Sequence, residues 1–321
     1  MEYLQVAVPS EFRLKTSHNP MFILLFLKFS GVLLTGLALG VTLCLGSPLR
    51  RTSLTAAWKW GIAAEFAWFL TSIVTAFASP GAPILDQGRL WTAILTVCPL
   101  IAALGARRPA SRVWGWFIVL PLMAVLGWPA FTVMSDWPEL APLKVQTPIC
   151  IGFALVMVMG VGNYVGTRFS GPALLAGLAT ILCILPLSTR SPLGLESAVY
   201  FQASAEILFA AAVFMAIRQG LRNGTEESPF DRLWFDFRDT FGIVWSVRIQ
   251  ERLNETAEKE SWNSRLGPTG FDWQSAISTE QRQETLVRMQ HALRWHLRRF
   301  VDPEWIDERL GEQTAPIAPD R

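Results

Sequence analysis

Seven long apolar stretches, separated by turn-forming residues, constrain the fold of this chain more than any other feature. A helix needs roughly 20 apolar residues to cross about 30 Å of hydrocarbon, because lipid offers no partner for an unpaired backbone group. Seven stretches meet or approach this length: residues 20–46, 56–78, 91–106, 113–134, 147–167, 172–188 and 197–217. The sequence therefore predicts an all-α polytopic transmembrane helix bundle of about seven spans, with the third and sixth spans short.

The first stretch has an alternative interpretation as a cleaved secretory signal. Its apolar run is about twice the usual length of 7 to 15 residues, and no A-x-A cleavage site follows it. We therefore expect a retained helix. Tryptophans near several predicted span ends, such as Trp58, Trp91 and Trp137, also favour a bilayer, because an amphipathic ring prefers the headgroup layer.

The charge of the chain divides it into two parts. Residues 1–218 hold fourteen Lys and Arg against eight Asp and Glu, whereas residues 219–321 hold fourteen against eighteen. We expect an N-terminal tail (1–19), a transmembrane bundle (20–218), a helical soluble region (219–311) and a disordered tail (312–321). No basic cluster with interleaved stacking aromatics is present, so no nucleic-acid partner is predicted.

Positive charge in the short loops predicts the orientation, because Lys and Arg near a span resist translocation. The loops after the second, fourth and sixth spans carry only Arg89, Lys144 and Arg190. The segments after the odd-numbered spans carry eight arginines: Arg50, Arg51, Arg107, Arg108, Arg112, Arg168, Arg218 and Arg222. This predicts an outside N-terminus and a cytoplasmic C-terminal region, in a plasma membrane or a bacterial inner membrane.

Three ionisable residues inside the predicted spans are the candidate ion- or substrate-coupling residues. A charge at mid-bilayer costs roughly 2.5 to 3.5 kcal/mol on insertion scales, so it needs a partner or a cavity. Glu65 and Glu206 each lie nine residues into a span, about 14 Å deep, and could reach the same level from opposite faces. Lys28 lies in the first span and could pair with either glutamate.

Three interpretations of this set stay open. The groups form a structural polar clamp that joins neighbouring helices, or they form a site for ion- or proton-coupled transport. In the third interpretation, Lys28 and Glu65 extend to the membrane interface, which a shift of the span boundary by one turn would allow.

The C-terminal region begins with an amphipathic helix that starts at Ser228-Pro229 and continues to Leu253. Its apolar face is rich in aromatic residues, and the candidate partner-docking residues are Trp234, Phe237, Phe241 and Trp245. This face either packs under the bundle or on its own region, binds a protein partner, or lies on the membrane surface. A capping box at Ser278-x-x-Gln281 predicts a second helix, and Asp302-Pro303 predicts a short third one.

No motif identifies a reaction, so enzymatic activity is left open and no cofactor or metal is predicted. All three histidines lie outside the spans, and no phosphate-binding or nucleophile motif is present. The leading prediction is a non-catalytic scaffold, assembly or accessory subunit, with the lipid bilayer and a protein partner as its contacts. The alternative is an ion- or proton-coupled transporter or channel that uses Glu65 and Glu206. An intramembrane enzyme is third.

Overall fold

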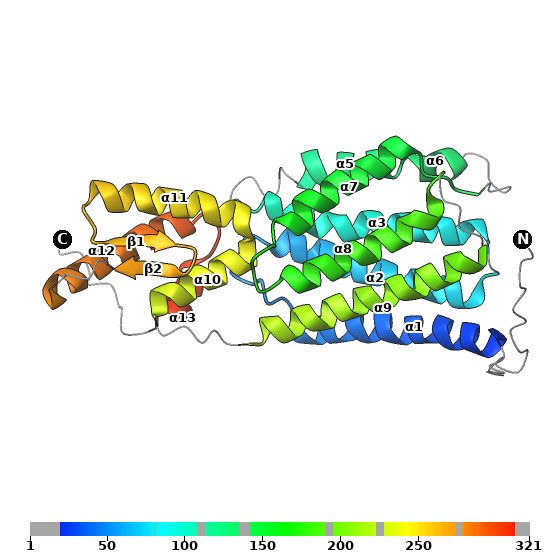
Figure 1. Ribbon diagram of the computed structural model, residues 1–321, viewed down its shortest axis with the longest axis horizontal. Helices are drawn as coiled ribbons and strands as arrows, with labels where there is room; N and C mark the ends of the chain where they lie inside the picture. The colour runs from blue at the N-terminus through cyan, green and yellow to red at the C-terminus, as the bar shows by residue number, and fades with distance from the viewer. Residues whose placement is uncertain are drawn as a thin grey trace, which may run out of the picture.

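The computed structural model describes residues 20–79, 81–107, 113, 115–134, 142–189, 195–222, 228–273 and 278–311. The predicted N-terminal tail and the predicted disordered tail, residues 1–19 and 312–321, lie outside the described residues. Figure 1 shows two parts placed end to end: a bundle of long helices and, on one end of it, the C-terminal region, residues 228–311.

The bundle consists of helices that run back and forth along its long axis (Figure 1). α2 packs against α1 and α3, and α9 packs against α1 and α8, so the first and last helices of the bundle are neighbours. The bounds are α1 (Pro20–Leu45), α2 (Thr55–Phe77), α3 (Pro83–Leu104), η2 (Gly115–Val119), α5 (Leu120–Leu126), α6 (Trp128–Met134), α7 (Thr147–Gly162), α8 (Ser170–Ile184), η3 (Leu185–Leu187) and α9 (Leu195–Gly220).

Five helices in the described part of the chain are long and apolar enough to cross a membrane. They are Leu25–Leu45, Thr55–Phe77, Pro83–Leu104, Ser170–Leu187 and Ser197–Gly220. Two further apolar helices, Gly115–Leu126 and Thr147–Gly162, are shorter. The prediction of a polytopic helix bundle is confirmed to this extent.

The prediction that the third span is short is wrong, whereas the sixth, Ser170–Leu187, is the shortest of these five helices at 18 residues. The third helix begins at Pro83 rather than at residue 91, because a proline suits the first turn and the polar residues after it are covered by neighbouring helices. The shorter helices are the fourth and fifth. The fourth is interrupted, since a π-helical segment precedes α5, and α5 ends at Leu126, just before Gly127.

The surface of the bundle is apolar and its interior contains polar groups. Phe26, Phe77 and Val158 are 65%, 77% and 72% exposed, whereas Gln202 and Glu206 are 1% exposed. A water-soluble protein rarely exposes so much contiguous apolar surface, and in lipid the polar groups must find partners inside. The chain is therefore a helical membrane protein.

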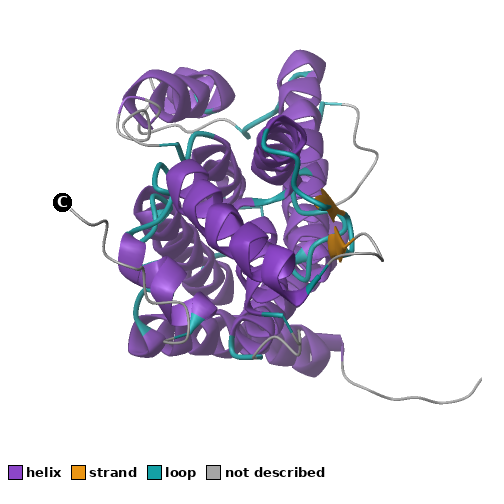
Figure 2. Ribbon diagram, turned by 90° about the vertical axis from the view of Figure 1, so that its left-hand side faces the viewer, coloured by secondary structure: helices purple, strands orange, loops and turns teal. Residues whose placement is uncertain are grey.

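The C-terminal region contains four helices and a hairpin in its described residues. The helices are α10 (Pro229–Phe241), α11 (Ile243–Lys259), α12 (Thr279–Leu297) and α13 (Pro303–Leu310). The strands β1 (Ser264–Gly267) and β2 (Gly270–Trp273) pair antiparallel, and Figure 2 shows them at the edge of this region.

The described residues are helical as predicted, and this short hairpin is a local feature that was not predicted. Its two strands are four residues long, too short for an alternating pattern to be recognised. A tertiary contact fixes it: the Asn254 side chain accepts from the Leu266 amide at 2.9 Å and donates to the Leu266 carbonyl at 3.0 Å. The strand therefore depends on helix α11 as much as on its own sequence.

A second correction concerns the amphipathic helix, which was predicted to run unbroken from Ser228 to Leu253. It ends at Phe241 and restarts at Ile243, because Gly242 adopts φ 80° and ψ 178°. The aromatic face is still buried as one cluster. The Phe300 ring lies 5.4 Å from Phe237, 5.4 Å from Phe241 and 5.0 Å from Trp245.

The loop between α1 and α2 pairs with the segment between α12 and α13. The Ser53 amide donates to the Phe300 carbonyl at 2.7 Å, and the Asp302 amide donates to the Arg51 carbonyl at 2.8 Å. An isolated β-bridge joins Thr52 to Val301. The C-terminal region is thus attached to the beginning of the bundle as well as to its last helix.

The predicted capping box is confirmed and gives a stability prediction. Ser278 Oγ accepts from the Gln281 amide at 3.2 Å, and the Gln281 side chain accepts from the Ser278 amide at 3.4 Å. We expect Ser278→Ala to lower the free energy of unfolding by about 1 kcal/mol, because the Gln281 amide loses the hydroxyl that accepts its hydrogen bond. Chemical denaturation in detergent measures this change.

Ser228 provides the matched control for that experiment. It is the N-cap residue of α10, but its side chain makes no capping hydrogen bond. Ser228→Ala should therefore leave the free energy of unfolding within about 0.5 kcal/mol of the original. An equal effect of the two substitutions would contradict the assigned role of Ser278.

Candidate functional site

A buried polar cluster lies inside the bundle and contains one of the predicted site residues. It consists of Asp86, Arg89, Gln202 and Glu206, from helices α3 and α9. Gln202 Nε2 donates to Glu206 Oε1 at 2.9 Å, and Arg89 Nε donates to Gln202 Oε1 at 3.3 Å. Arg89 Nη1 pairs with Asp86 Oδ1 at 3.2 Å. The charged groups of Asp86, Arg89 and Glu206, which would be costly to expose to lipid, therefore have polar partners within the protein.

A glycine of α1 makes room for this cluster. A Cβ atom on Gly31 would lie 1.8 Å from Glu206 Oε2, so the absence of a side chain lets α1 pack directly over the carboxylate. The hydroxyl of Thr35 donates to the Gly31 carbonyl at 2.8 Å and contacts Ser72 Oγ at 3.3 Å. Helices α1, α2, α3 and α9 thus all contribute polar groups at this level.

Glu65 lies elsewhere in the bundle. It accepts from Thr42 Oγ1 at 3.2 Å, and its second oxygen is buried with no hydrogen-bond partner in the described residues. Thr42 and Gly31 are eleven positions apart on α1, which corresponds to roughly 16 Å along the helix. The two glutamates therefore do not meet at one level, contrary to the expectation.

Lys28 lies on α1, one turn before Gly31, and is half-buried. Among the described residues it forms no ion pair with either glutamate. In the part of the chain that the structure describes, no hydrogen bond or ion pair joins any two of the three predicted coupling residues. Their part in ion or substrate coupling stays a prediction.

Sequence reasoning missed Arg89 and Gln202 as members of the cluster. Arg89 was assigned to a loop, because the third span was expected to begin at residue 91; it is 6% exposed inside α3. A usable pattern was present, since Gln202 and Glu206 are four residues apart and so share one helix face.

The predicted partner-docking residues lie mostly in the interior. Trp234, Phe237 and Phe241 are at most 1% exposed. Trp245 is half-buried, and its Nε1 donates to the Leu104 carbonyl at the end of α3 at 3.2 Å. The aromatic face thus packs on its own region and on the bundle. Its role in binding a partner stays a prediction and would require α10 to leave this core.

Asn163, at the end of α7, joins the bundle to the break between α10 and α11. The Ile243 amide donates to the Asn163 carbonyl at 2.8 Å, and the Val244 amide donates to Asn163 Oδ1 at 3.0 Å. Asn163 Nδ2 donates to the Phe241 carbonyl at 3.2 Å. The side chain and the carbonyl of Asn163 therefore form hydrogen bonds with backbone groups on both sides of Gly242.

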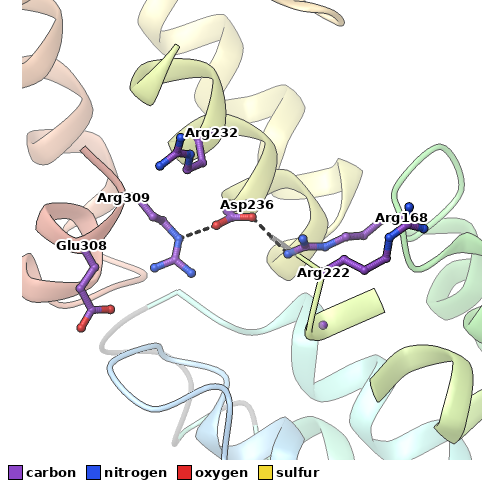
Figure 3. Close-up of a pocket in the computed structure, with 7 residues that line it drawn as sticks. Arg168, Arg222, Arg232, Asp236, Glu308 and Arg309 are labelled. Carbon is purple, nitrogen blue, oxygen red and sulfur yellow. Dashed lines mark hydrogen bonds and ion pairs between the residues drawn. The ribbon is translucent and has the colours of Figure 1, made fainter. Parts of the chain in front are cut away.

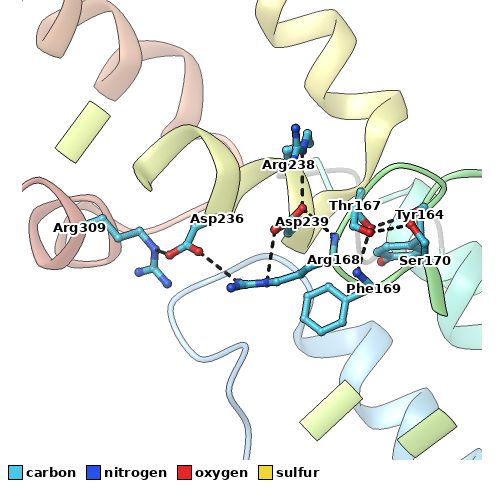
Figure 4. Close-up of polar contacts among 9 residues, drawn as sticks. All are labelled: Tyr164, Thr167, Arg168, Phe169, Ser170, Asp236, Arg238, Asp239 and Arg309. Carbon is cyan, nitrogen blue, oxygen red and sulfur yellow. Dashed lines mark hydrogen bonds and ion pairs between the residues drawn. The ribbon is translucent and has the colours of Figure 1, made fainter. Parts of the chain in front are cut away.

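Four charged residues form a second connection, the junction network of Arg168, Asp236, Asp239 and Arg309 (Figure 4). Asp239 Oδ1 accepts from the Arg168 amide at 3.2 Å, and Asp239 Oδ2 forms an ion pair with the Arg168 guanidinium at 3.3 Å. Asp236 Oδ1 pairs with Arg168 Nη2 at 3.1 Å, and Asp236 Oδ2 pairs with Arg309 Nε at 2.7 Å. The loop between α7 and α8 is thereby held against α10 and α13.

Burial opposes the charged forms within this network. Desolvation raises the pKa of Asp239 above its ordinary value, although the Arg168 amide and the Arg238 and Arg168 guanidinium groups counteract the rise. Desolvation also lowers the pKa of Arg309, and the neighbouring Asp236 carboxylate counteracts that shift. The opposite charges therefore offset part of the cost of their own burial.

No group of three or more His, Cys, Asp or Glu side chains that could hold a metal ion occurs among the described residues. Comparison of the chain with protein-family models, with curated proteins and with solved structures finds no match.

Proposed function

We propose that this membrane protein is a non-catalytic scaffold, assembly or accessory subunit, in which the bundle and the C-terminal region act as one rigid unit. The attachment at the end of the bundle supports this most directly. Asn163 and Arg168 hold α10 and α11 through backbone and side-chain contacts, and the loop before α2 pairs with the segment after α12. A soluble surface held at a fixed position relative to the membrane is suited to organising a partner.

Recovery of a partner in mild detergent tests this proposal. We expect the intact protein to co-purify with a stoichiometric protein partner, and Asn163→Ala combined with Arg168→Ala to reduce its recovery by about tenfold while the chain remains in the membrane fraction. The control is Arg252→Ala, because Arg252 forms an exposed pair with Glu255 away from the junction. Recovery of the intact protein alone, in pure form, would refute the scaffold proposal.

A second candidate function, ion- or proton-coupled transport, has one specific observation in its favour. The buried polar cluster runs from Asp86, near the start of α3, to Glu206, in the middle of α9. Glu65, on α2, adds a further carboxylate beside Thr42, roughly 16 Å from Gly31 along the axis of α1. Carboxylates at different depths are the arrangement that stepwise transfer of a proton or cation requires.

Flux measurements in proteoliposomes separate the two functions. If the chain is a transporter, Glu206→Gln and Glu65→Gln should each reduce pH-gradient-driven proton or cation flux by at least about tenfold. The control is Glu255→Gln, which removes a carboxylate that is exposed in the C-terminal region. Flux that is unchanged in both variants would exclude transport through these residues. An intramembrane enzyme has no comparable observation in its favour among the described residues.

We also propose that the two shorter apolar helices complete seven crossings, with the N-terminus outside and the C-terminal region in the cytoplasm. The assignment of Arg89 to the interior supports this orientation, because only Lys144 and Arg190 then remain in the loops after the even-numbered spans. A C-terminal green fluorescent protein fusion should fluoresce in a bacterial host, and an alkaline phosphatase fusion should be inactive. The reverse pair of results would invert the orientation.

A further inference from the structure

A cavity of about 500 Å³ lies where the bundle meets the C-terminal region. Figure 3 shows Asp236 between Arg168 and Arg309, with Arg232 on the same helix as Asp236. The charged residues that line the cavity come from four elements of the chain: Arg168, Arg222, Arg232, Asp236, Glu308 and Arg309. Four arginines face two carboxylates here, so the lining carries a formal excess of two positive charges.

Both carboxylates are already paired. Asp236 uses its two oxygens for Arg168 and Arg309, at 3.1 Å and 2.7 Å, and Glu308 pairs with Arg51. Asp236 therefore fixes two guanidinium groups in position without neutralising the whole lining. Held guanidinium groups are preorganised donors, and their planar fork matches the oxygens of a phosphate.

The cavity lies at the height where the apolar surface of the bundle ends. Gly220, which also lines the cavity, is the last residue of the candidate span Ser197–Gly220. Arg168, another lining residue, lies two residues before the candidate span Ser170–Leu187. Leu221, next to Arg222, is 68% exposed. Phosphate groups of lipids occupy this height in a bilayer, and basic pockets at helix ends bind anionic headgroups.

We propose that this cavity binds a phosphate-bearing anion, through the guanidinium groups of Arg168, Arg222, Arg232 and Arg309. The anion can come from an anionic lipid headgroup or from a soluble phosphate compound. In either case the bound phosphate bridges the bundle and the C-terminal region, because its four arginine ligands belong to both parts.

Binding measurements on the full-length protein in detergent test this proposal in two arms. Native mass spectrometry counts bound phosphatidylglycerol, with phosphatidylcholine as the neutral comparison, and calorimetry measures binding of inorganic phosphate and pyrophosphate. The test variant is Arg222→Gln with Arg232→Gln, which leaves the junction network in place. The control is Arg288→Gln, an exposed arginine of α12 that pairs with Glu284.

We expect the double variant to bind its anion at least about tenfold more weakly, whereas the control binds as the intact protein does. Retention of phosphatidylglycerol by the intact protein, lost in the double variant, supports a lipid source. Binding of pyrophosphate without phosphatidylglycerol retention supports a soluble source. Equal binding by all three proteins in both arms would overturn the proposal.

A measurement on the unmodified protein covers the case in which the double variant does not fold. Phosphatidylglycerol or pyrophosphate should raise the melting temperature of the intact protein by several degrees, because a ligand that binds only the folded state stabilises it. The gain should shrink in high salt, since the contacts are charge-assisted. No shift with either anion would contradict the proposal independently of any variant.

Discussion

Replacing Gly242 by alanine is expected to lower the free energy of unfolding of the C-terminal region by about 3 kcal/mol. The residue has φ 80° and ψ 178°, a conformation almost exclusive to glycine that costs other residues about 1 to 3 kcal/mol. A Cβ atom there would also lie 2.2 Å from Asn163 Nδ2 and 2.5 Å from the Asn163 carbonyl oxygen. The side chain can shift only by giving up hydrogen bonds to both sides of the break.

Thermal unfolding followed by tryptophan fluorescence measures this loss, because Trp234 and Trp245 lie in the affected core. We expect a fall in melting temperature of roughly 5 to 10 °C. Gly162→Ala is the matched control: a Cβ atom on Gly162 meets nothing within 4 Å, and alanine has the higher helix propensity. Equal melting temperatures for Gly242→Ala and the control would show that the approach of Asn163 does not constrain this position.

The second large effect is expected from Arg89→Ala. Removing one partner of a buried charged group costs about 3 to 5 kcal/mol, because the remaining charge stays buried without compensation. Arg89 pairs with Asp86 and holds Gln202, which in turn holds Glu206. Neutral interhelical hydrogen bonds in membranes contribute only about 0.6 kcal/mol on average, so most of the expected loss comes from charge.

A double-mutant cycle tests the origin of that loss by SDS titration in mixed micelles. Glu206→Gln keeps a hydrogen-bonding side chain but removes the charge, so it should recover about 1 kcal/mol or more in the Arg89→Ala background. Leu33→Ala serves as a reference, because Leu33 is 62% exposed on the outside of the bundle. Effects of Arg89→Ala and Glu206→Gln that add to within about 0.3 kcal/mol would argue against an electrostatic link between them.

The hydrophobic pattern was sufficient to predict the bundle, because the need to pair every backbone group in lipid leaves few alternatives. Helix ends were less predictable. Arg89 illustrates the reason: a polar residue near a span boundary has the same local sequence whether it faces water or a buried glutamine. Only the position of Gln202 on another helix decides between the two.

The C-terminal region shows the same limit. The spacing of Phe230, Leu233, Trp234 and Phe237 predicted a buried helix face, and these residues are buried. Gly242 was a potential break, but a single glycine within a helical pattern does not reveal whether the helix continues. The contact with Asn163 decides this, and its bond to the Ile243 amide joins residues 80 positions apart. Functional assignment was harder still, since the charges that meet at the junction come from distant segments.

The pairing of Ser53 with Phe300 and of Arg51 with Asp302 has a consequence for biosynthesis. The loop that contains Ser53 is synthesised directly after α1, whereas its partner Phe300 is made 247 residues later. Membrane insertion of the helices therefore has to be complete before this loop can acquire its backbone partners. A chain that terminates before Phe300 would leave the first loop without these backbone partners and available to chaperones or proteases, so the pairing also reports that the segment between α12 and α13 has been made.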